Sequence, residues 1–115
     1  MTSKISCGLI CNIQNDSAEI QQWLNRSAAY DATSHEYELL SVEEENWELG
    51  VVLARLFHKA KMFFPELKRF VEAEMLTVYL DVCIVHYDRY PAMIIEGDVM
   101  KQIRELKADI AIDMY

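Results

Sequence analysis

Every second residue between positions 76 and 84 is a large aliphatic one: Leu76-Thr77-Val78-Tyr79-Leu80-Asp81-Val82-Cys83-Ile84. Successive side chains of a β-strand point to opposite faces of a sheet, so this run predicts a strand with one buried face. The opposite positions are polar or amphipathic, and Val85 and Tyr87 extend that face. We therefore expect a sheet with helices over its apolar face and with its other face open to solvent or to a partner.

Alternation of the same kind recurs in three other segments, at residues 5–13, 37–42 and 110–114. Each of these segments predicts a further strand. The apolar residues of the last segment are expected to face the same core as Val78, Leu80 and Val82; they are Ile110, Ile112 and Met114.

The segments between these strands are expected to be irregular or only briefly extended. Residues 30–35 and 86–91 predict loops, and residues 43–46, which are three glutamates and an asparagine, predict a solvated turn. Residues 93–95 predict a short extended piece.

Four helices are indicated by apolar residues at spacings of three and four. The candidate N-caps of the first helix, which is expected to end near residue 29, are Asn15, Asp16 and Ser17. Its inner face is expected to carry Ile20, Trp23 and Leu24. A second helix begins near Glu48 and ends before Pro65, where a short third helix starts, because proline suits the first turn of a helix. The fourth follows Gly97, with Val99, Ile103 and Leu106 at helical spacing.

These elements predict a single α+β domain over residues 1–115. Its predicted architecture is a mainly antiparallel, four-stranded, plait-like sheet with helices on one face. The chain has 115 residues, of which 52% are hydrophobic, so it can hold a core without disulfides or metal.

The three cysteines are expected to be free thiols in a reducing compartment. Cys7 and Cys11 lie too far apart on one strand to pair with each other, and we expect them in the core. His35, His58 and His86 stand alone rather than at metal-ligand spacings, so neither a metal nor a cofactor is expected.

The net charge of −8 argues against a nucleic-acid partner, because the chain would repel phosphate backbones. Residues 31–48 hold seven acidic residues and no Lys or Arg, whereas residues 55–69 hold five Lys or Arg residues and one acidic residue. The molecule should therefore be electrically two-sided. No apolar run is long enough to span a bilayer and no signal peptide is evident, so a cytoplasmic location with no membrane partner is expected.

The strongest candidate for a binding surface is the open face of the sheet together with the acidic run. Tyrosine offers a large contact area with a polar tip, and charge steers a partner of opposite sign. Two copies could also pair through this face as a homodimer. The candidate partner-binding residues are Glu43, Glu44, Glu45, Tyr79, Asp81, Tyr87, Asp113 and Tyr115.

An enzymatic site is the weaker alternative. His86, Asp88 and Arg89 follow the clearest strand, where catalytic groups often stand, but no glycine-rich phosphate loop or second histidine accompanies them. Cys83 and His86 are three residues apart on one strand and so point to opposite faces. No catalytic residue is therefore assigned.

Residues 76–82, Pro91 and residues 102–115 form a pattern that resembles a bacterial family of small uncharacterised domains. The pattern ends in Asp113-Met114-Tyr115, which is similar to the family's Ile-Asp-Ile-Asp-like strand that finishes in tyrosine. Trp47 and the helix after it are also similar to the family pattern. In place of the family's Arg-Lys-Gly-Asp-like stretch, residues 41–46 are acidic here.

The family resemblance implies no activity, so the functional expectation rests on the residues themselves. We expect a non-enzymatic interaction domain for a basic protein, of the size and charge of immunity proteins that neutralise basic toxins. A regulatory domain that senses a small ligand is the alternative, and a small enzyme that uses the loop of His86 and Asp88 is the third possibility.

Overall fold

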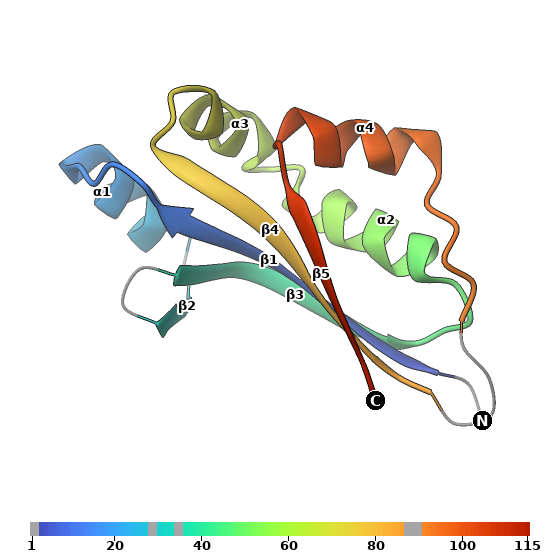
Figure 1. Ribbon diagram of the computed structural model, residues 1–115. Helices are drawn as coiled ribbons and strands as arrows, with labels where there is room; N and C mark the ends of the chain where they lie inside the picture. The colour runs from blue at the N-terminus through green and yellow to red at the C-terminus, as the bar shows by residue number, and fades with distance from the viewer. Residues whose placement is uncertain (1–2, 28–29, 34–35, 87–90) are drawn as a thin grey trace.

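The computed structural model describes residues 3–27, 30–33, 36–86 and 91–115 (Figure 1). Along the chain the elements are β1 (Lys4–Ile13), α1 (Ala18–Arg26), β2 (Tyr30–Thr33), β3 (Glu36–Glu45), α2 (Leu49–Ala60), α3 (Phe64–Glu72), β4 (Leu76–Val85), α4 (Gly97–Glu105) and β5 (Asp109–Met114). The α+β class and the single domain are as predicted.

All strands belong to one mixed sheet with the order β2-β3-β1-β4-β5. The four predicted strands form its body, and the short β2 adds a fifth at one edge. Neighbouring strands are antiparallel except for β4 and β5, which run parallel. The sheet is therefore mixed, although most of its pairings are antiparallel.

The plait-like arrangement predicted from the element order is wrong. A plait contains two parallel strand–helix–strand units, whereas here only β4, α4 and β5 form one. In place of the first such unit, α1 leads from β1 to the edge strand β2. The chain then turns back into β3, which lies between β2 and β1 and is antiparallel to β1.

Two predicted irregular segments are strands instead. Residues 30–33 of the predicted loop form β2, while residues 34–35 lie outside the described part. The predicted turn at residues 43–46 is wrong because β3 continues to Glu45, where Lys4 of β1 still pairs with it. Residues 93–95 form no strand, and Ala92 makes only an isolated bridge with Glu48.

Helices cover one face of this sheet (Figure 1). α2 packs over β1 and β3, α3 packs against β4, and α4 packs against α2. Trp23 of α1 reaches the same layer, where its ring meets the edges of Phe63 and Phe70 at centroid distances of 6.2 and 5.2 Å. Pro65 lies at the start of α3, as predicted.

The core lies between the helices and the aliphatic face of the sheet. Ile5, Cys7, Leu9 and Cys11 of β1 are completely buried, as are Leu80, Val82 and Ile84 of β4. Ile110, Ile112 and Met114 lie on this same face, because they pair with Leu80, Val82 and Ile84. This confirms the predicted orientation of β5, but all three side chains remain 36–44% exposed.

The cysteines differ in accessibility in the way that their strand positions imply. Cys7 and Cys11 are buried, as predicted, and Cys83 is only partly buried on the opposite face of the sheet. Burial is the main cause that raises the pKa of both Cys7 and Cys11 to about 12.

We expect a thiol reagent to modify Cys83 in the folded protein and to modify Cys7 and Cys11 only after unfolding, because the reactive thiolate is scarce in the core. Mass spectrometry of timed labelling checks this, with Cys83 as the internal control. Equal labelling rates for Cys7 and Cys83 would contradict it.

The raised pKa values of Cys7 and Cys11 also make stability depend on pH. Since unfolded thiols ionise near pH 8.5, the free energy of unfolding should fall as the pH rises from about 8.5.

Candidate functional site

The face of the sheet that no described helix covers carries seven carboxylates, and we call it the open face. Alternation and register place these groups together from three strands: Glu36, Glu38, Glu43, Glu45, Asp81, Asp109 and Asp113. Lys4 is the one Lys or Arg within the strands as described. The basic side chains of residues 55–69 instead belong to the helical side, so the predicted two-sided charge is supported.

A β-bulge turns two of these carboxylates toward the open face. Leu9 pairs with Leu40, but the next residue of β1, Ile10, pairs with Glu38, which leaves Leu39 as the extra residue. If β3 had no bulge and alternated regularly, Glu38 would share the face of Leu40 and would point into the core. The bulge therefore sets both Glu38 and Glu36 on the open face.

Tyr79 lies across the centre of the open face. Its hydroxyl donates a hydrogen bond to Glu36 on the far side of β1, so the ring passes over β1 beside Ile10. This explains why Ile10 is only 5% exposed although no described helix covers this face. The hydrogen bond to Glu36, together with burial, raises the pKa of Tyr79 to about 12.

Gly8 leaves room for a second carboxylate at the centre of β1. A Cβ atom on Gly8 would lie 3.0 Å from Oε1 of Glu38, so the Glu38 carboxylate rests over the glycine. Asp81 pairs with Gly8 from the other side, on β4. Two carboxylates therefore flank the centre of the open face.

The structure divides the predicted acidic triplet between the two faces. Glu43 and Glu45 lie on the open face, where Lys4 Nζ is 3.5 Å from Glu43 Oε1 and Ser6 donates a hydrogen bond to Glu43. Glu44 lies on the helical side and forms an ion pair with Arg55, whose guanidinium holds the pKa of the Glu44 carboxyl below its usual value. The prediction that all three residues share one surface is therefore wrong for Glu44.

The remaining predicted residues extend the open face or lie outside the described chain. Asp113 lies on the open face beside Cys83, and Tyr115 is 70% exposed at the end of β5. Tyr87, Asp88 and Arg89 are outside the described residues. His86 is described, and its backbone N–H donates to the carbonyl oxygen of Tyr115.

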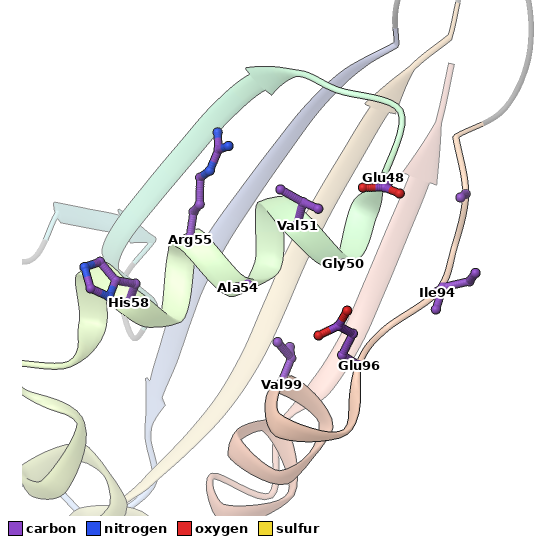
Figure 2. A pocket seen from close by; sticks show the side chains of 10 residues that line it. Glu48, Gly50, Val51, Ala54, Arg55, His58, Ile94, Glu96 and Val99 are labelled. Carbon is purple, nitrogen blue, oxygen red and sulfur yellow. The ribbon is translucent and has the colours of Figure 1, made fainter.

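A groove that the sequence does not predict runs along α2, beside residues 92–99 (Figure 2). It has a volume of about 540 Å³ and an apolar lining from Val51, Ala54, Ile94 and Val99. Glu48 and Glu96 contribute carboxylates, and α2 adds Arg55 and His58, as Figure 2 shows. We call this the α2 groove.

The α2 groove exists because residues 92–95 approach α2 closely at Gly50. The backbone N–H of Leu49 donates to the carbonyl of Ala92, and the N–H of Ala92 donates to the carbonyl of Trp47. A Cβ atom on Gly50 would lie 2.2 Å from the carbonyl oxygen of Ile94. The glycine within the predicted helix was the sequence signal that could have indicated this approach.

Among the described residues, no group of three or more His, Cys, Asp or Glu side chains is arranged to hold a metal ion. Within the same residues, no helix has the length and apolar character needed to cross a membrane. In comparisons with known proteins, the chain matched no protein-family model, no curated protein and no solved structure.

Proposed function

We propose that this chain is a non-enzymatic domain that binds a basic protein partner through the open face of its sheet. A cytoplasmic location and the resemblance to a bacterial family belong to the same proposal. Immunity proteins that neutralise basic toxins are the nearest analogy in size and charge.

The observation that carries the proposal is the crowding of seven carboxylates on the open face, where Lys4 is the one Lys or Arg of the described strands. A surface of one sign steers a partner of the opposite sign and raises its association rate. Tyr79 adds an aromatic ring at the centre of the face, where interfaces are enriched in aromatic side chains.

Neutralising open-face carboxylates is expected to slow the association of a basic partner. The test variant combines Glu43→Gln, Glu45→Gln and Asp81→Asn, all exposed on the open face. With a partner isolated from the native cell extract, association at low salt should slow several-fold and depend less on salt. Surface plasmon resonance at several salt concentrations measures both effects.

A matched control removes three exposed carboxylates elsewhere, by Glu66→Gln, Glu72→Gln and Glu96→Gln. Both variants change the net charge equally, so a difference between them reports the position of the charges. Tyr115→Ala separates contact from steering, because losing a contact mainly speeds dissociation. If both triple variants slow association equally, the open face only serves solubility.

The α2 groove favours a second candidate function, the sensing of a small ligand. Grooves with an apolar lining and a few polar groups are the usual sites for small molecules. Val51, Ala54 and Val99 line the same groove as the carboxylates of Glu48 and Glu96. This lining suits a small ligand that has an apolar body and one positive charge. This candidate gains if the open-face variant leaves partner binding unchanged.

A further inference from the structure

Exposed apolar side chains are concentrated at one edge of the molecule. In the part of the chain that the structure describes, all large exposed apolar residues except Met62 fall between positions 93 and 115. Ile110, Ile112 and Met114 are the ones on β5, which is the last strand of the sheet. The apolar face of the sheet therefore extends to an edge that the helices only partly cover.

The outer edge of β5 pairs with no other strand among the described residues. The N–H of Tyr115 donates to Ile84, and the carbonyl of Tyr115 accepts from His86, so both backbone groups of Tyr115 point toward β4. Because these directions alternate along a strand, the N–H and carbonyl groups of Ile110, Ile112 and Met114 point away from the sheet. The residues with exposed apolar side chains are thus also the ones that can pair with another strand.

We propose that two copies of this chain form a dimer by antiparallel pairing of their β5 strands, with Ile112 opposite the partner's Ile112. In this register Ile112 exchanges two backbone hydrogen bonds with its counterpart, and Ile110 does so with the partner's Met114. The two five-stranded sheets become one continuous sheet. The two-fold axis runs perpendicular to the sheet, so both helical layers lie on one side and both open faces on the other.

Charge favours this register over the register in which the two-fold axis passes through Ala111. If the axis passed through Ala111, Asp109 would lie directly opposite the partner's Asp113 twice, and like charges in that position are destabilising. With the axis through Ile112, Asp109 lies opposite the partner's Tyr115 and Asp113 opposite the partner's Ala111. Face-to-face pairing of two open faces is opposed by the seven carboxylates that each face carries.

In this register a groove beside β5 can receive the side chain of the partner's Met114. The groove has a volume of about 350 Å³ and lies between α4 and the start of β5, with Met100, Ile103 and Ile110 in its lining. The partner's Met114 pairs with Ile110 on the same face, so its flexible side chain reaches this groove. The two-fold axis repeats the contact, and each copy therefore supplies one methionine and one groove.

The buried area suits a reversible dimer. Covering the strand edge, the half-exposed apolar side chains of β5 and the adjoining groove removes on the order of 500–700 Å² per copy, slightly less than the ~800 Å² per partner of a standard interface. The association is therefore expected to depend on concentration, and it leaves both open faces free for the proposed basic partner.

The oligomeric state of the protein alone tests the dimer. Sedimentation equilibrium of the wild-type chain should give a concentration-dependent mass that approaches twice 13.4 kDa. Ile112→Lys places two like charges at the axis and should weaken the dimer by about tenfold or more. Met62→Lys, at a residue 84% exposed on another surface, should leave the dissociation constant unchanged, and circular dichroism confirms that both variants are folded.

Single cysteines distinguish the two registers in a Cys83→Ser background. Ile112→Cys should form a disulfide-linked dimer on mild oxidation, because directly opposed Cα atoms lie about 5.5 Å apart. Ala111→Cys should not, since it meets its own counterpart only in the rival register. A wild-type chain that stays monomeric, equal effects of Ile112→Lys and Met62→Lys, or preferential cross-linking of Ala111→Cys would overturn the proposal. No basic partner is present, so these outcomes are independent of the proposed function.

Discussion

Replacing Leu80 by alanine is expected to lower the free energy of unfolding by about 2 to 5 kcal/mol. Leu80 is completely buried at the middle of β4 and pairs with Leu9 of β1, which is also completely buried. Truncation removes the transfer free energy of three carbon atoms and leaves a cavity between the sheet and the helices. That cavity cannot close easily, because the neighbouring positions of β1 and β4 are themselves fixed by the strand pairing.

Denaturant unfolding measures the effect, with Met62→Ala as the control. Met62 is 84% exposed, so its truncation should change the free energy of unfolding by no more than about 0.5 kcal/mol. A loss below about 1 kcal/mol for Leu80→Ala would contradict the core position of this strand.

Gly50→Ala is expected to destabilise the protein by about 1 to 3 kcal/mol, even though alanine is the better helix former. The new methyl carbon would lie 2.2 Å from the carbonyl oxygen of Ile94 and 3.3 Å from its carbon, so residues 92–95 must move away from α2. Backbone atoms cannot rotate out of the way as a side chain can. The movement should weaken the hydrogen bond from the N–H of Leu49 to the carbonyl of Ala92.

Gly97→Ala is the matched control for this substitution. A Cβ atom on Gly97 meets nothing within 4 Å, so the variant should be as stable as the wild type or more stable by up to about 1 kcal/mol. Thermal unfolding compares the two variants, and hydrogen exchange at residues 92–96 should rise for Gly50→Ala alone. Equal melting temperatures for both would show that residues 92–95 do not press on α2.

The long strands were predictable because their signal is local. In residues 5–13 and 76–84 the aliphatic side chains recur with the period of a strand, and that period fixes which residues share a face whatever the partner strand is. The same reasoning correctly placed Cys7 and Cys11 in the core and gave β5 its orientation. Pro65 likewise marked the boundary between α2 and α3 by its own geometry.

The acidic end of β3 was not predictable in this way. Glu43, Glu44 and Glu45 have low strand propensity and resemble a solvated turn, but β1 extends to Lys4 and offers them hydrogen-bonding partners. The pairing of distant residues outweighed the local preference. Pairing with β1 also made residues 43–45 part of a strand, which put Glu44 on the helical side and its two neighbours on the open face. Which acidic residues lie on the candidate surface therefore depended on β1, a distant part of the chain.

Local sequence therefore defined the faces of this molecule, and long-range pairing defined what lies on and over each face. Alternation is a property of single strands, whereas the bulge at Leu39 arises only between β1 and β3, and it turned Glu36 and Glu38 outward. The apolar pattern of β5 identified its inner side but not its coverage, because the exposure of Ile112 depends on how far α4 extends over the sheet. Whether β5 runs parallel or antiparallel to β4 was likewise set by the path of the chain through α4, which no residue of β5 encodes.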